Sequence, residues 1–343
     1  MWTNFFSKEM GIDLGTANTL IYAKGKGIVL REPSVVAVKS DSSKEVLAVG
    51  DEAKLMIGRT PENINTIRPL KDGVIADFDA TQAMLKYFIK KVAGKYSMKS
   101  PKIVVCYPSG VTQVERNAIE EATYRAGAKK VYLIPEPVAA AIGAGLPVAE
   151  ATGSLVVDIG GGTTDIALLS LGNIVASRSL RMAGDELDQS IISYIRREYN
   201  LMVGERTAEF IKTEVASALL PETEILLEIR GRDLITGLPK SVTISSLQVY
   251  EAIKETINTI VNAVKSVLEE TPPELSADVI DRGIILTGGG ALLKDLDKLL
   301  MSEAKVPVKV ADNPLDCVVY GAGKFLDNIG NPSIMNSLLI TGK

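Results

Sequence analysis

Two segments of the sequence place an aspartate shortly before glycine and threonine residues. They are Asp13-Leu-Gly-Thr16 and Asp158-Ile-Gly-Gly-Gly-Thr163, and each follows an apolar run. Such turns offer backbone N–H groups and hydroxyls to anionic oxygens, and glycine lets the backbone approach closely. We therefore expect bound phosphate, with Asp13 and Asp158 as water-mediated ligands of a bridging Mg²⁺. The sequence contains no GxxxxGK[ST] motif, so the site is not a P-loop.

A third glycine turn, Gly288-Gly-Gly290, follows another apolar run. Any one of these turns could be an ordinary tight turn, but three of them, two with an aspartate, favour a ligand site. Glu136 stands between two prolines just past an expected strand, where a carboxylate can orient water for in-line attack on a γ-phosphate. Alternatively, Glu136 is a charge at the start of the next helix that stabilises the helix dipole, and both roles can coexist.

The composition of the 343-residue chain excludes several classes of function. The absence of histidine removes Ser-His-Asp and Cys-His nucleophile pairs and every His-based metal site. Because 38 basic and 42 acidic side chains give a net charge of −4, we expect no nucleic-acid partner. The sequence shows neither a membrane-spanning run nor a secretory signal, which predicts a cytosolic protein. Cys106 and Cys317 lie far apart in apolar segments and are expected to be buried free thiols.

Short β-branched runs alternate with amphipathic stretches, a pattern typical of an α/β protein of about two domains. We expect strands at 103–107, 131–134 and 283–286. Helices are expected at 112–126, which begins with a capping box, and at 247–270, which has one long apolar face. A further helix is expected to run from the Gly288 turn to Leu300.

The sequence also contains an internal repeat. A glycine, Gly27 or Gly172, follows each of the two aspartates by 14 residues. Both copies predict strand, Gly/Thr turn, strand, turn, strand, so two similar halves would face each other across a cleft. Two unrelated hairpins remain the alternative. The spans 31–69 and 179–241 interrupt this plan and are expected to form a small subdomain in each half.

Four segments together resemble the superfamily of actin, hexokinase and chaperone ATPases: residues 13–19, 135–147, 158–165 and 286–293. Within that superfamily the chain is similar to the bacterial actins of the MreB family, through residues 57–61, 68–77, 204–209 and 230–239. The resemblance covers about residues 11 to 325. Asp165 departs from the pattern, because many members have glutamate there.

This resemblance implies an α/β, actin-like fold, which is a duplicated ribonuclease H-like fold. Two large domains would each carry a small inserted subdomain, with nucleotide in the central cleft. The implied division is 1–31, 70–145 and 322–343 for subdomain IA, 32–69 for IB, 146–178 and 242–321 for IIA, and 179–241 for IIB.

The resemblance also implies roles for individual residues around ATP or ADP with Mg²⁺. The β- and γ-phosphates would lie between Thr16, Ala17 and Asn18 on one side and Gly161, Gly162 and Thr163 on the other. Glu209 and Lys212 would flank the adenosine, and Gly288, Gly289, Gly290 and Ala291 would close over the base and the α-phosphate. Glu136 would be catalytic, and Thr163 would help to hold the attacking water.

The implied function is a slow ATPase that polymerises with itself into membrane-associated filaments and organises cell shape, together with cell-shape membrane proteins. A small-molecule kinase of the same fold is an alternative, which would use an aspartate to deprotonate a substrate hydroxyl. A chaperone-like ATPase is a further alternative, disfavoured because no peptide-binding domain follows the two halves.

Two features favour attachment to the inner face of the cell membrane. On a helix, Trp2, Phe5, Phe6 and Met10 would share one face, and they precede the first expected strand. From Ala80 to Val114 there is no acid, yet six lysines occur there, with Tyr96 and Met98 in an expected loop: Lys86, Lys90, Lys91, Lys95, Lys99 and Lys102. Aromatic insertion beside lysines suits an anionic membrane surface. A staple on the protein's own domain beside a solvated lysine face is the alternative. The tail after residue 325 has no expected role.

Overall fold

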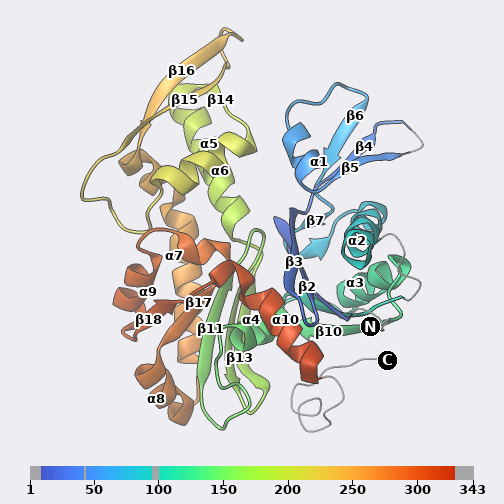
Figure 1. The fold of residues 1–343 in the computed structure, drawn as a ribbon. Coiled ribbons are helices and arrows are strands. Elements are labelled where there is room, and N and C mark those ends of the chain that lie inside the picture. The colour runs from blue at the N-terminus through green and yellow to red at the C-terminus, as the bar shows by residue number, and fades with distance from the viewer. Residues whose placement is uncertain (1–8, 42–43, 95–99, 329–343) are drawn as a thin grey trace.

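The computed structural model describes residues 9–41, 44–94 and 100–328, and it consists of two halves with the same sheet topology (Figure 1). The first large sheet has the order β10-β9-β1-β2-β3, and the second has the order β13-β12-β11-β17-β18. In each sheet, three strands form an antiparallel meander, a later strand pairs in parallel with the first of them, and a further strand pairs in parallel with that one. The expected repeat is confirmed.

The first half contains β1 (Met10–Leu14), β2 (Asn18–Ala23), β3 (Gly27–Pro33), β7 (Leu70–Lys71), β8 (Val74–Ile75), α2 (Phe78–Ala93), β9 (Lys102–Tyr107), α3 (Gln113–Arg125), β10 (Lys130–Pro135) and α4 (Glu136–Gly143). The small unit between β3 and β7 contains β4 (Val36–Lys39), β5 (Val46–Val49), α1 (Asp51–Met56) and β6 (Ile64–Ile67).

The second half contains β11 (Ser154–Ile159), β12 (Thr164–Ser170), β13 (Asn173–Leu180), α7 (Ser246–Glu269), α8 (Pro273–Arg282), β17 (Ile284–Thr287), the 3₁₀ turn η1 (Gly289–Leu292), α9 (Leu296–Ala304), β18 (Val308–Val310), the 3₁₀ turn η2 (Pro314–Asp316) and α10 (Cys317–Asn328). Its small unit contains α5 (Gly184–Tyr199), β14 (Leu201–Met202), α6 (Glu205–Val215), β15 (Leu226–Asp233) and β16 (Pro239–Ser245). Both small units lie at the same end of the molecule (Figure 1).

Local sequence signals account for most of these boundaries. The capping box at the start of α3 is present: Glu115 N donates to Thr112 Oγ1, and Thr112 N donates to the Glu115 carboxylate at 2.7 Å. The turns after β2 and β12 are also equivalent, because Gly27 and Gly172 have φ values of 78° and 77°, a left-handed conformation that favours glycine.

The continuous helix expected from the Gly288 turn to Leu300 was wrong. The chain instead forms η1 and then begins α9 only at Leu296. Asp295 has a left-handed backbone, with φ of 60°, and its carboxylate accepts hydrogen bonds from Ser217 and Lys298. Ala218 N also donates to the carbonyl of Lys294. The contacts with Ser217 and Ala218, which follow α6, hold the 293–295 segment out of a helical path.

The helices that end the two halves cross each other, and each packs on the sheet of the other half. The helix α4 closes the first half but packs on β11 and β12, and α10 closes the second half but packs on β1, β2 and β9. A separate apolar cluster fills the space between the halves, with α4 and α10 at its centre. Four of the expected subdomain boundaries fall within elements: that at 31/32 lies in β3, that at 178/179 in β13, that at 241/242 in β16 and that at 321/322 in α10.

The first strand corrects one expectation about the N-terminal stripe. Met10 is the first residue of β1, where it pairs with Ala23 and Ile103 and is fully buried. It therefore cannot contribute to an exposed apolar face. The other stripe residues, Trp2, Phe5 and Phe6, lie outside the described residues. No helix in the described ranges combines the length and the apolar character needed to cross a bilayer.

Candidate functional site

The two glycine-bearing hairpin tips meet between the halves. A Cβ atom on Gly161 would lie 2.7 Å from the Ala17 Cβ, and one on Gly162 would lie 2.6 Å from the Thr16 Oγ1. Any side chain at either glycine would therefore displace the facing tip. The structure thus brings together three of the residues expected on one side of the phosphates and three expected on the other, with Asn18 exposed and Thr163 buried.

An acidic cluster lies below these tips. Asp13 and Asp158 stand at equivalent positions near the ends of β1 and β11, each opposite a residue of its hairpin partner. Burial, followed by the charge of Asp158, raises the pKa of Asp13 to about 8. Burial also raises the pKa of Asp158 to about 7, with a further increase from Asp165, although a hydrogen bond from Thr287 Oγ1 at 2.7 Å opposes it.

Glu136 is the first residue of α4, directly after β10, and is only 7% exposed. Its pKa is raised well above the usual range, first by burial and then by the charges of Asp165, Asp13 and Asp158. The expected carboxylate position is therefore a buried site among three other acids. The start of a helix also suits this charge, so the structural role considered from the sequence is equally available.

The donor set fits a hydrated Mg²⁺. Asp158 is buried and Asp13 is partly exposed. The pKa values of both carboxyls are raised, and no basic side chain is among the groups that shift them. Within the described ranges no three acidic, histidine or cysteine side chains are placed to hold a metal by themselves. A Mg²⁺ at Asp13 and Asp158 would need water and phosphate oxygens for its remaining positions, as this ion usually does.

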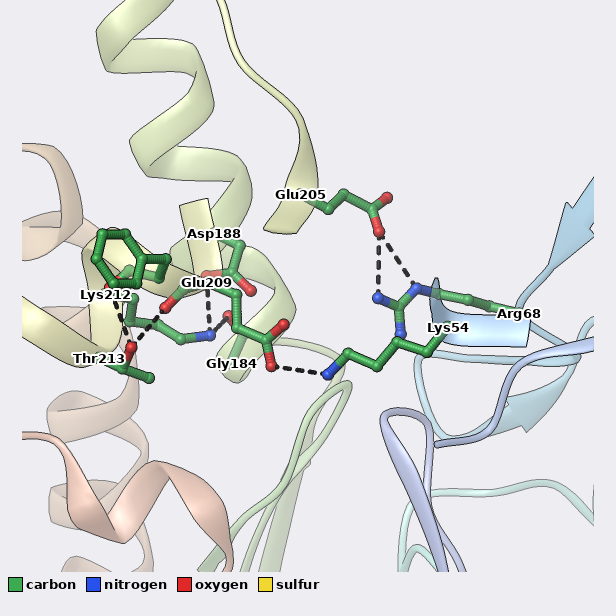
Figure 2. A network of polar contacts seen from close by, with 9 residues as sticks. Lys54, Arg68, Gly184, Asp188, Glu205, Glu209, Lys212 and Thr213 are labelled. Atoms are coloured by element: carbon green, nitrogen blue, oxygen red, sulfur yellow. Dashed lines mark hydrogen bonds and ion pairs between the residues drawn. The ribbon is translucent and has the colours of Figure 1, made fainter. Parts of the chain in front are cut away.

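Glu209 and Lys212 lie on the inner side of α6 and take part in the contacts shown in Figure 2. The Lys212 Nζ lies 2.9 Å from an Asp188 oxygen and donates to the Gly184 carbonyl at 2.8 Å. A Cβ on Gly184 would lie 3.3 Å from the carbonyl oxygen of Gly160, so Lys212 is close to the second hairpin.

Glu209 connects the two small units instead of standing alone. Its Oε1 lies 3.3 Å from Lys54 Nζ of α1, and Glu205 pairs with Arg68 at 3.1 Å (Figure 2). A cavity of about 760 Å³ lies beside these pairs, lined by Ile57–Arg59, residues 204–207, Phe210 and residues 228–230. It contains no residue of the expected nucleotide site.

The Gly288 turn lies directly beside the end of β11. Gly288 has φ of 78°, and a Cβ there would lie 2.3 Å from the Ile159 carbonyl oxygen. A Cβ on Gly290 would lie 2.2 Å from the Ile159 Cγ2. These close approaches place Gly289 and the buried Ala291 one strand away from Asp158, because Thr287 at the end of β17 pairs with Asp158.

Two further contributors to the site were missed from the sequence. Gly73, in the turn between β7 and β8, donates from its N–H to Thr16 Oγ1 at 3.2 Å, and a Cβ there would lie 2.6 Å from Thr163 Cγ2. Asp165 accepts hydrogen bonds from Ser109 N at 2.8 Å and Ser109 Oγ at 2.6 Å, across the two halves. The Lys71-Asp-Gly73 turn was the only local signal for the first. Asp165 stood out in the sequence only as a departure from the family pattern, and nothing local pointed to Ser109 as its partner.

The lysine-rich segment is only partly available as a basic surface. Lys86, Lys90 and Lys91 lie on α2, and Lys102 begins β9. Lys91 pairs with Glu32 at 2.5 Å, and Lys102 pairs with Glu9 at 3.3 Å. Lys95, Tyr96, Met98 and Lys99 lie outside the described residues. As expected from the sequence, Cys106 and Cys317 are buried free thiols.

Comparison with known proteins places this architecture in one family. The profile of the MreB/Mbl protein family matches residues 7–333. The chain is 58% identical over 324 residues to the cell shape-determining protein Mbl of Bacillus subtilis, covering 94% of this chain and 97% of that protein. It is 56% identical over 328 residues to the cell shape-determining protein MreB of Escherichia coli K12, covering 94% of each.

A solved structure agrees with the sequence relatives. The crystal structure of MreB 5 of Spiroplasma citri bound to AMPPNP superposes on this chain with a TM-score of 0.89 at 39% sequence identity. The superposition covers 94% of this chain and 97% of the Spiroplasma citri chain. The expected actin-like α/β fold is confirmed by this likeness. The chain therefore belongs to the MreB/Mbl family of bacterial actins.

Proposed function

We propose that this protein is a bacterial actin that binds ATP between its halves, polymerises into membrane-attached filaments and helps to set cell shape. The observation that carries the proposal is the meeting of two equivalent hairpin tips above a buried acidic cluster. The relatives named as cell shape-determining proteins support the cellular role. The AMPPNP bound to the related Spiroplasma citri protein supports the nucleotide.

The nucleotide would lie with its phosphates between the tips. Thr16, Ala17 and Asn18 would contact them from the first half, and Gly161, Gly162 and Thr163 from the second. Lys212 and Glu209 would flank the adenosine from α6, and the turn from Gly288 to Ala291 would cover the base and the α-phosphate. The two tips approach each other closely, and glycine at positions 161 and 162 is what allows this approach.

Asp13 and Asp158 would hold Mg²⁺ through water. The bound ion would supply positive charge to the phosphates and would favour the ionised form of the nearby carboxyls. Because the pKa values of these two aspartates lie near or above neutrality, they gain the most from that charge. Nucleotide binding should therefore depend strongly on Mg²⁺ and should release protons at neutral pH.

Hydrolysis would use Glu136 as the base that orients and deprotonates the attacking water, with Thr163 helping to hold that water. A general base acts only in its ionised form, and the pKa of Glu136 is raised well above its usual range by burial and by three neighbouring acids. A raised pKa lowers the ionised fraction of Glu136, which is in keeping with slow hydrolysis. The cationic charge of the bound ion would increase that fraction.

Filament and membrane attachment would act together. The protein would associate with itself, with an anionic membrane surface and with cell-shape membrane proteins, in the cytoplasm at the inner face of the cell membrane. A single protomer would hold the membrane weakly through the N-terminal aromatic residues and the lysine-rich segment. Many protomers in one filament would add their contacts by avidity.

Electron microscopy of the purified full chain with ATP on anionic lipid vesicles tests this proposal. We expect filaments on the vesicle surface with ATP and Mg²⁺, and few with the Asp158→Ala variant. Sedimentation with ATP, compared with ADP release stimulated by small hydroxylated substrates, separates a polymer from a kinase. Soluble monomers whose ADP release rises with such a substrate would refute the filament proposal.

A further inference from the structure

A short segment, residues 313–317, lies between the Gly288 turn and the crossing of α4 and α10. At one side the carbonyl of Pro314 accepts a hydrogen bond from Gly288 N at 2.8 Å. On the same side a Cβ on Gly289 would lie 3.2 Å from Leu315 Cδ2. The position of the Gly288 turn therefore depends directly on this segment.

The other side of the segment contacts the first half. A Cβ on Gly143 of α4 would lie 1.8 Å from the Cys317 carbonyl oxygen, so the two backbones are in direct contact. The Asp316 carboxylate forms a two-pronged ion pair with Arg31, in which Arg31 NH2 donates to Asp316 Oδ2 at 2.7 Å and Arg31 NH1 donates to Oδ1. Arg31 belongs to β3, the edge strand of the first sheet.

The geometry of this pair favours a positioning role. The Asp316 side chain is only 12% exposed, whereas that of Arg31 is 52% exposed, so the guanidinium covers a carboxylate that the segment has already buried. A two-pronged guanidinium–carboxylate pair fixes orientation as well as distance. It therefore fixes residues 313–317 relative to the first sheet, and through them the Gly288 turn.

We propose that Arg31 of the first half is a positioning residue for the nucleotide, acting through Asp316 on the turn from Gly288 to Ala291. The Arg31–Asp316 pair thus couples the relative placement of the two halves to the contacts that residues 288–291 would make with the base and the α-phosphate. This inference rests on the proposed nucleotide site. Arg31 is not among the residues expected around the nucleotide, and the sequence resemblance did not single it out.

The test is nucleotide release from the full chain, at a protein concentration at which sedimentation shows no polymer. Dissociation of a fluorescent ADP analogue with Mg²⁺ is measured for the native protein, Arg31→Gln and Asp316→Asn, well below the unfolding temperature of each. We expect release to accelerate about 5-fold or more in both variants, the lower end of typical coupling between sites. The effects should not add in the double variant.

The matched control is Arg178→Gln. Arg178 also forms an ion pair on a large-sheet strand, with Glu270 at 2.6 Å, but both partners belong to the second half and are about half exposed. It should leave release unchanged. The exchanged pair, Arg31→Asp with Asp316→Arg, should restore slow release, which a simple loss of stability would not do. Arg31→Lys keeps the positive charge but loses the two-pronged geometry of the guanidinium, so it should give an intermediate rate of nucleotide release.

The outcomes separate the two proposals. If release from Arg31→Gln and Arg31→Lys equals that from the native protein, or matches Arg178→Gln, the positioning role is wrong. The same conclusion follows if the exchanged pair releases nucleotide as fast as either single variant. If instead the native protein binds no nucleotide, or Asp158→Ala binds it equally well, the proposed nucleotide site itself is wrong.

Discussion

The free energy of unfolding of the nucleotide-free protein should fall as the pH rises from about 6 to about 8. In the folded chain the pKa values of Asp13 and Asp158 are about 8 and about 7, whereas the ordinary value for aspartate is 3.8. Over this pH range the folded state binds more protons than the unfolded state. Stability is therefore lost as the pH rises through the two folded pKa values.

The size of the effect follows from these values. Asp158 alone should cost about 1.4 kcal/mol between pH 6 and pH 8, and Asp13 about 2.3 kcal/mol, if each titrates independently. The unfolding entropy of a 343-residue chain is about 0.7 kcal/mol per degree, so the unfolding temperature should fall by about 5 °C. Glu136 acts in the same direction because its pKa is also raised.

Thermal unfolding followed by circular dichroism at several pH values measures this slope. Histidine and thiol groups add little to the slope, because the chain has no histidine, and burial raises the pKa of Cys317 to about 12 and that of Cys106 above its usual range. Asp188, whose pKa burial raises to about 6, adds a smaller slope at the low end of the range. The variant with Asp13→Asn and Asp158→Asn should show a clearly shallower slope over the same range, because Glu136 and Asp188 still have raised pKa values that contribute to it. An unfolding temperature that stays level or rises in the native protein, or an unchanged slope in the double variant, would refute the assignment.

Three further expectations address function. Glu136→Ala should hydrolyse ATP about 10²–10⁴-fold more slowly while still binding it; unchanged phosphate release would leave Glu136 only a helix-start charge. Asp158→Ala should weaken Mg²⁺-dependent nucleotide binding in calorimetry, and undiminished affinity would contradict the metal assignment. Deletion of residues 1–8 should reduce flotation with anionic liposomes at both low and high salt without affecting ATP binding, because the aromatic contribution resists screening. Equal flotation of the truncated protein would assign attachment to another segment, with the apolar tail from Ile334 to Ile340 tested next.

The repeat of the two hairpins could be predicted because its signals are local. Each copy has an apolar strand, an aspartate, a Gly/Thr turn and a later glycine, and Gly27 and Gly172 indeed adopt the same left-handed conformation. The start of α3 was equally predictable, because its capping box needs only residues within one turn. Short sequence patterns of this kind predict the strands, turns and helix starts. They also predict that the expected phosphate-binding residues lie at two equivalent hairpin tips.

Contacts between distant segments could not be predicted in this way. The lysines of α2 and β9 suggested a basic surface, but Lys91 and Lys102 are paired with Glu32 and Glu9 from other parts of the sheet. Met10 fitted a helical stripe by spacing and lies instead in a strand, because pairing with two neighbouring strands outweighs a short local pattern. The Arg31–Asp316 pair joins residues 285 positions apart, with no sequence motif around either.

The packing of α4 and α10 ties the two halves together at one crossing. Glu136 belongs to the first half by chain connectivity, but α4 packs on β11 and β12 of the second. At the crossing, a Cβ on Gly321 would lie 1.8 Å from the Ala139 carbonyl oxygen, mirroring the contact of Gly143 with Cys317. The two helix backbones are thus too close to slide independently of each other. A change in the angle between the halves would therefore move α4 and α10 together, and through α4 it would reach the proposed catalytic residue Glu136.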